Sequence, residues 1–81
     1  MHSHLPEKNA DFLEAECLRL ARRRLHCEHL EAVKIGPTRP LGSGPNWEFL
    51  AFKPELHDRA YDNAMRAINL LRRAYALARK R

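Results

Sequence analysis

The chain has no long apolar segment. No stretch approaches the roughly 18 consecutive apolar residues that span a bilayer. The first residues, MHSHLPEKNADF, have neither the basic start nor the apolar stretch of a secretory signal. We therefore expect a cytoplasmic protein that makes no contact with membranes.

Glycine and cysteine are scarce, and their positions are informative. All three glycines and three of the five prolines lie in one stretch, GPTRPLGSGPNWEF, residues 36–49, which we expect to contain a stiffened loop. The two cysteines, Cys17 and Cys27, would lie roughly 15 Å apart on a single helix, which is too far for a disulfide. Two reduced thiols suit a reducing compartment.

Motifs of known catalytic sites are also missing. The sequence has no Gly-x-Ser-x-Gly elbow, no Gly-rich loop leading into Lys-Ser or Lys-Thr, and no His-Glu-x-x-His. Cys27 with His29, or His57 with Asp58 and Tyr61, could supply a nucleophile or a base, but these residue types alone define no site. We expect a protein that is not an enzyme and that needs no cofactor.

Helical periodicity marks the N-terminal third of the chain. Residues 9–30 contain no glycine or proline, and apolar residues recur at spacings of three and four: Leu13, Cys17, Leu20, Ala21 and Leu25. This pattern predicts an amphipathic helix over residues 9–30. Asn9 can cap it through its side-chain oxygen. We expect residues 1–8, ahead of the helix, to be flexible.

Two strands are predicted in the middle of the chain. In residues 31–36, Val33 and Ile35 alternate with Lys34, and in residues 46–53 the sequence NWEFLAFK is rich in aromatics. Strict alternation would place Trp47, Phe49 and Ala51 on one face and Glu48, Leu50 and Phe52 on the other. Residues 37–45 are expected to form the loop between the strands. We expect the two strands to pair antiparallel and Trp47 to pack in the core.

A second helix is predicted over residues 58–79, with Asp58 as its N-cap and a stripe of small and apolar residues along one side. The whole chain, residues 1–81, is then a single α+β domain of the order α–β–β–α, an antiparallel two-stranded hairpin covered by two helices. Such a hairpin has two free edges. We therefore expect a homodimer, in which two hairpins joined edge to edge would make a four-stranded sheet.

Basic residues are concentrated in the second helix. The chain carries a net charge of +5, and residues 63–81 contain six basic residues and no acidic one. Basic residues recur at intervals of seven along this helix, with others beside them and one in the loop, so the candidate binding residues are Arg59, Arg66, Arg72, Arg73, Arg79, Lys80 and Arg39.

The basic row has two interpretations. A solvated helix face or a dock for an acidic protein partner is favoured, because no aromatic residue is interleaved to stack on bases. We therefore expect a small binding or adaptor protein that acts through protein–protein contacts, with a partner and a process that the sequence does not name. The alternative is a regulator that binds DNA or RNA through this basic helix face.

A weaker candidate is the sequence HCEH. His26 and His29, three residues apart, would share one side of the first helix with Cys27 next to them, and the three could ligate a metal. No second pair of ligands stands at a recognisable spacing, such as Cys-x-x-Cys. The favoured interpretation is structural, with Cys27 buried and the histidines in water, so we expect no metal.

Overall fold

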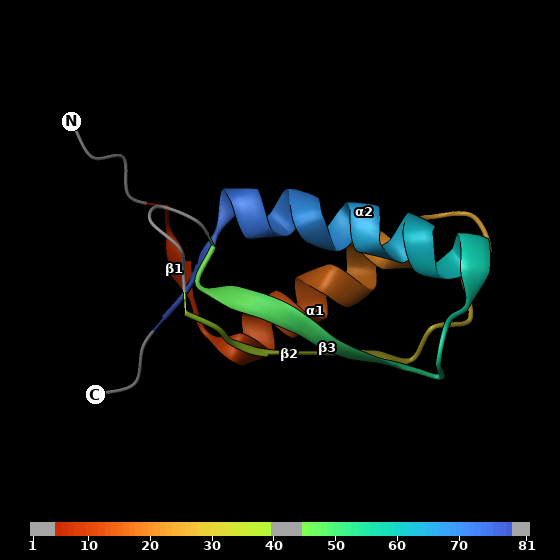
Figure 1. Ribbon diagram of the computed structural model, residues 1–81, viewed down its shortest axis with the longest axis horizontal. Coiled ribbons are helices and arrows are strands. Elements are labelled where there is room, and N and C mark those ends of the chain that lie inside the picture. The colour runs from red at the N-terminus through yellow and green to blue at the C-terminus, as the bar shows by residue number, and fades with distance from the viewer. Residues whose placement is uncertain (1–4, 40–44, 79–81) are drawn as a thin grey trace.

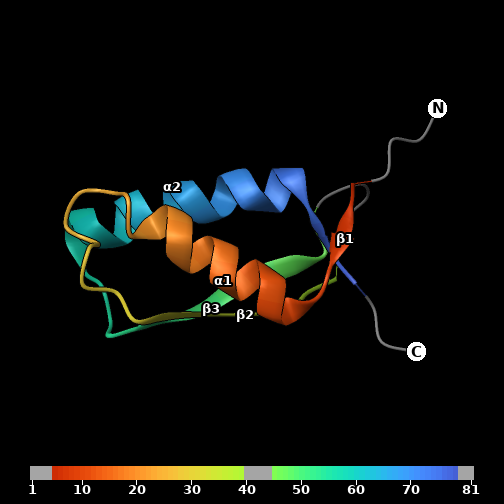
Figure 2. The same cartoon turned by 180° about the vertical axis from the view of Figure 1, so that it is seen from behind.

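The structure, a computed structural model, describes residues 5–39 and 45–78. Its elements in chain order are β1 Glu7–Lys8, α1 Ala10–Ala21, β2 Ala32–Pro37, β3 Trp47–Lys53, α2 Asp58–Ala74 and β4 Ala76–Leu77. The strands β2 and β3 form an antiparallel hairpin, and both helices lie on the same side of it (Figures 1 and 2). The predicted α+β class, with a hairpin packed against two helices, is confirmed.

The first helix is shorter than predicted. Asn9 caps it as expected, because its Oδ1 accepts a hydrogen bond from the Phe12 backbone N–H at 2.8 Å. The helix ends at Ala21, so the predicted helix over residues 9–30 is wrong beyond that point. Residues 22–30 form consecutive turns, and the backbone N–H of Cys27 bonds the carbonyl of Arg24.

Packing explains this early end. Cys27 and Leu30 are both buried in the same core as Cys17. On a continuous helix, Leu30 would lie thirteen residues after Cys17 and therefore roughly 140° around the helix axis from it. It would then face solvent. The turns bring Leu30 back to the core, at the expense of the last helical hydrogen bonds.

A β-bulge changes which side chains of β3 face the helices. Val33 lies opposite Phe52 and Ile35 lies opposite Phe49, so one extra residue, Leu50, is inserted between these pairs. Trp47 and Phe52 are therefore both buried, although strict alternation placed them on opposite faces. Leu50 remains 58% exposed on the outer face.

The core lies between the hairpin and the two helices. Trp47 is fully buried, which confirms its predicted place in the core. The other members of the buried cluster come from the two helices, the hairpin, the turns after α1 and the segment before α2: Leu13, Cys17, Ala21, Cys27, Leu30, Val33, Ile35, Phe52, Leu56, Ala64, Ile68 and Leu71.

Each outer edge of the hairpin carries a helix side chain. The Thr38 N–H bonds the Asn46 carbonyl, and in an antiparallel pair the hydrogen-bonded residue pairs alternate with pairs whose backbone groups point outward. Pro37 with Trp47, and Ile35 with Phe49, are pairs of the outward-pointing kind. On β2, Glu14 of α1 accepts from the Ile35 N–H at 3.0 Å, and the outward position of Pro37 has no N–H. On β3, the Trp47 carbonyl accepts from a side chain of α2, Arg72, at 2.8 Å.

Both ends of the described chain are more ordered than predicted. Glu7–Lys8 pairs in parallel with Ala76–Leu77, so residues 7 and 8 belong to a strand and not to a flexible segment. The second helix ends at Ala74 and not at residue 79, because Tyr75 is extended and leads directly into β4. Residues 1–4 and the tip of the predicted loop, residues 40–44, lie outside the described residues.

The start of α2 also differs from the prediction. His57 is its N-cap residue and makes no side-chain capping hydrogen bond. Asp58, the predicted cap, is the first residue of the helix and has a positive φ of 53°. A non-glycine residue in that region is uncommon, although Asp tolerates it better than most.

Candidate functional site

Three predicted arginines form one exposed row on α2. The buried side chains of this helix, Ala64, Ala67, Ile68 and Leu71, point toward the core. Arg59, Arg66 and Arg73 are all exposed on the opposite side. Neighbouring members are seven residues apart, which corresponds to roughly 10.5 Å along the helix. Among the residues that the structure describes, none of the three takes part in an ion pair.

Arg72 has a different environment. Its Nε donates to the Trp47 carbonyl at 2.8 Å, and its Nη1 lies 3.5 Å from the Asn69 Oδ1. The side chain is half-buried between α2 and the edge of β3. Arg72 therefore fastens the helix to the hairpin and does not belong to the exposed row.

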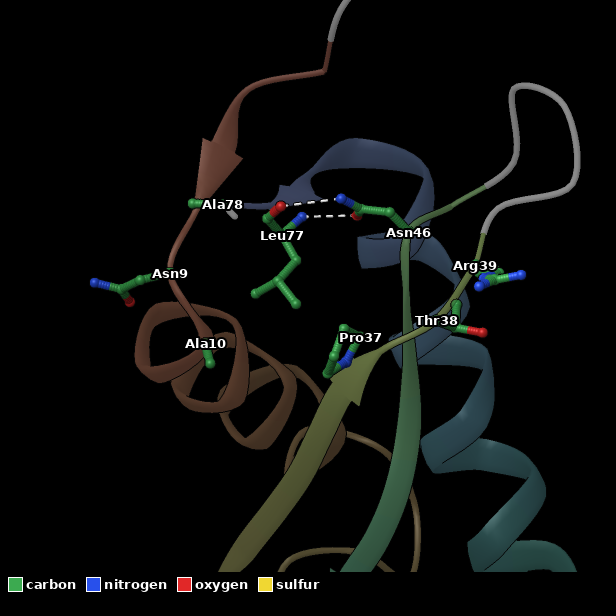
Figure 3. Close-up of a pocket in the computed structure, with 8 residues that line it drawn as sticks. All are labelled: Asn9, Ala10, Pro37, Thr38, Arg39, Asn46, Leu77 and Ala78. Carbon is green, nitrogen blue, oxygen red and sulfur yellow. Dashed lines mark hydrogen bonds between the residues drawn. The ribbon is translucent and has the colours of Figure 1, made fainter. Parts of the chain in front are cut away.

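The other predicted binding residues lie elsewhere. Arg39 is exposed just after β2, at the rim of a cavity, and its side chain points away from Leu77 (Figure 3). Arg79 and Lys80 lie outside the described residues. The structure thus assembles only part of the predicted set.

Two residues that sequence reasoning missed complete the row. Asn63 and Leu70 alternate with the three arginines at spacings of four and three, so these five residues lie along one stripe of the helix. We call this stripe, made of Arg59, Asn63, Arg66, Leu70 and Arg73, the arginine face. Leu70 is 55% exposed on it. The four–three spacing is present in the sequence, but the apolar stripe beside it dominates the periodicity of the helix.

The metal candidates are not brought together. His26 and His29 are exposed, whereas Cys27 is buried and its Sγ donates to the Ala60 carbonyl at 3.3 Å. Burial, and next the negative charge of Glu28, raise the pKa of the Cys27 thiol. Within residues 5–39 and 45–78, no three His, Cys, Asp or Glu side chains are placed to hold one ion.

A cavity of about 720 Å³ opens beside the paired chain ends (Figure 3). Its described lining residues are Asn9, Ala10, Pro37, Thr38, Arg39, Asn46, Leu77 and Ala78. The Leu77 side chain points into the space between Ala10 and Pro37 (Figure 3). The lining amides have structural partners, since Asn9 caps α1 and Asn46 bonds Leu77. None of these described lining residues is a carboxylate, a histidine, a cysteine or a lysine.

Comparisons with protein-family models, with curated proteins and with solved structures gave no match for this chain. In the described part of the chain, neither helix has the length and apolar character that a membrane crossing requires.

Proposed function

We propose that this protein is a small non-enzymatic binding module that acts through protein–protein contacts. The observation that carries the proposal is the arginine face, where three exposed arginines and an exposed leucine lie along the side of α2 that points away from the core. Mixed cationic and apolar surface of this kind suits an acidic protein partner, because arginine pairs with carboxylates and leucine adds apolar burial.

Two further observations support a binding role without catalysis, and a reducing compartment. Burial, followed by the charges of Glu14 and Glu16, raises the pKa of the Cys17 thiol to about 12, and the pKa of Cys27 is raised as well. Neither thiol is then a thiolate near neutral pH, and thiols in this state are poor nucleophiles. Both cysteines are free and buried, which is consistent with our proposal that the protein works in the cytoplasm.

We also propose that the protein forms a homodimer through the outer face of the hairpin. No element of the described chain lies over this face, where Leu50 is exposed beside Lys34 and Glu48. A two-fold contact is self-complementary, and this face carries both a cation, Lys34, and an anion, Glu48, that can pair between two copies. Because Glu14 and Arg72 already bond the outer edges, we place the contact on the face and not at the edges.

The alternative function is nucleic-acid binding, and the observation that supports it is the regular spacing of the three arginines. Such a row could follow a phosphate backbone, and its affinity would then fall steeply with salt. Duplex DNA and single-stranded RNA at about 50 mM salt are suitable probes, since backbone-driven binding is strong there. Absence of binding by the wild-type protein under these conditions excludes this alternative.

Affinity capture from the source cell, with and without nuclease, tests the proposed function. Wild type is compared with the double variant Arg66→Gln/Arg73→Gln, which should keep the helix because Gln is a good helix former. We expect wild type to retain an acidic protein after nuclease treatment and the variant to lose it. Retention by both proteins would move the binding site elsewhere, and loss on nuclease treatment would favour the alternative.

A further inference from the structure

The turns after α1, distant in sequence, lie against the arginine face. The Nδ2 of Asn63 donates to the Leu25 carbonyl at 3.0 Å, and the Cys27 thiol bonds the Ala60 carbonyl one turn away. These two contacts fix residues 24–27 along the flank of α2. Asn63 stands between Arg59 and Arg66 on the helix, so Leu25 is held beside the N-terminal half of the arginine face.

The side chains at this junction are exposed. Leu25 is 68% exposed, the most of any large apolar side chain among the described residues. Arg24, just before it, is partly exposed, and its carbonyl accepts from the Cys27 N–H. The turns that end α1 at Ala21 therefore bury Cys27 and at the same time present Leu25 to solvent.

We propose that Arg24 and Leu25 complete the arginine face, and that the completed surface binds an acidic, leucine-containing helical segment of another protein. This inference rests on the proposed protein-binding function and names its partner class. Carboxylates of the segment pair with Arg59, Arg66 and Arg73. Its apolar residues pack between Leu25, in the turns after α1, and Leu70, on α2, so that both leucines contact the same bound helix.

The exposed leucines distinguish this partner from other anionic ones. A phosphate backbone gains nothing from Leu25 or Leu70, and no aromatic residue of the completed surface offers a stacking platform for bases. An anionic membrane would need a broad apolar face, but the apolar face of α2 is buried in the core. The acidic helical segment uses both the charge and the apolar side chains.

The test uses a fluorescently labelled synthetic helical peptide of about 18 residues, with leucines at heptad spacing and glutamates between them, at about 50 mM salt. Leu25→Ala and Leu70→Ala should each weaken its binding about five- to tenfold. Leu5→Ala is the matched control, since Leu5 is also an exposed leucine but lies in the N-terminal segment, outside the completed surface and the proposed dimer contact. It should bind like wild type. Thermal melting confirms that each variant is folded.

The outcomes separate this inference from the proposed function. If Leu70→Ala and Arg66→Gln/Arg73→Gln weaken binding but Leu25→Ala does not, the inference is overturned and the proposed function stands. A titration to about 1 mM peptide detects weak complexes as well. If the wild-type protein does not bind the peptide over this concentration range, the named partner class is wrong. Equal or tighter binding of duplex DNA or of anionic vesicles, unaffected by either leucine substitution, also overturns it.

Discussion

The Asn46 side chain bonds both backbone groups of Leu77. Its Nδ2 donates to the Leu77 carbonyl at 3.0 Å, and its Oδ1 accepts from the Leu77 N–H at 2.9 Å. On the other side of β4, the N–H groups of Ala76 and Ala78 donate to carbonyls of the N-terminal segment. One amide side chain thus satisfies the backbone groups of Leu77 that a neighbouring strand would otherwise bond. It also holds β4 against the end of the hairpin (Figure 3).

Replacement of Asn46 by alanine should destabilise the protein by about 1–3 kcal/mol, because the Leu77 backbone loses both partners on one edge. Urea unfolding of wild type and Asn46→Ala measures this difference. Thr38→Ala is a suitable control, since Thr38 lines the same cavity but its side chain makes no hydrogen bond among the described residues. It should change the unfolding free energy by less than about 0.5 kcal/mol. Equal effects of the two substitutions would contradict the role of Asn46.

The long elements could be predicted from the sequence because each follows a strong period. The spacing of Leu13, Cys17 and Ala21 predicts α1, and the alternation of Val33, Lys34 and Ile35 predicts β2. The two-residue strands β1 and β4 are too short to show any period, and they exist because of contacts between distant segments. The early end of α1 has no signal in the sequence either, since arginines are good helix formers and the turns follow from the burial of Cys27 and Leu30 in the core.

The part of the candidate site that depends on helical periodicity was predictable, and the part that depends on tertiary contacts was not. The seven-residue spacing of Arg59, Arg66 and Arg73 correctly placed them on one exposed side of α2. The same helix assignment included Arg72, whose bond to Trp47 depends on the position of β3 and has no trace in the sequence. Tertiary contacts likewise decide that Leu25 stands beside Asn63.

Adjacent arginines on α2 should respond differently to the same substitution. Arg72→Gln removes a charged hydrogen bond to the Trp47 carbonyl and should cost about 1–3 kcal/mol of unfolding free energy. Arg73→Gln changes only an exposed side chain and should stay within about 0.5 kcal/mol of wild type. Chemical denaturation of both variants decides the matter, and equal stabilities would show that Arg72 contributes nothing to the fold.

The raised pKa of Cys17 predicts a loss of stability at alkaline pH. The folded protein keeps this thiol protonated up to about pH 12, whereas the unfolded chain releases its proton near the ordinary value of 9.0. Below pH 9 both states are protonated and stability is unaffected; as pH rises toward 12, the unfolded state is favoured. The difference in unfolding free energy between wild type and Cys17→Ala should therefore shrink over this range. A difference that is constant from pH 8 to 11 would contradict the raised pKa.

The proposed homodimer predicts a melting temperature that rises with protein concentration, because association stabilises the folded state by mass action. Sedimentation equilibrium measures the association directly. Leu50→Glu should weaken it, since it would bring two carboxylates together on the outer face of the hairpin. A mass near 9.5 kDa up to high micromolar concentration would exclude the dimer.

The most direct test of the binding account is a map of backbone amide chemical shifts in the ¹⁵N-labelled protein as the acidic leucine peptide is added. The account predicts that the largest changes follow the arginine face from Arg59 to Arg73 and include Leu25, while the hairpin face around Leu50 stays unchanged. Largest changes on the hairpin face, or around Leu77 at the cavity, would place binding elsewhere and contradict the account.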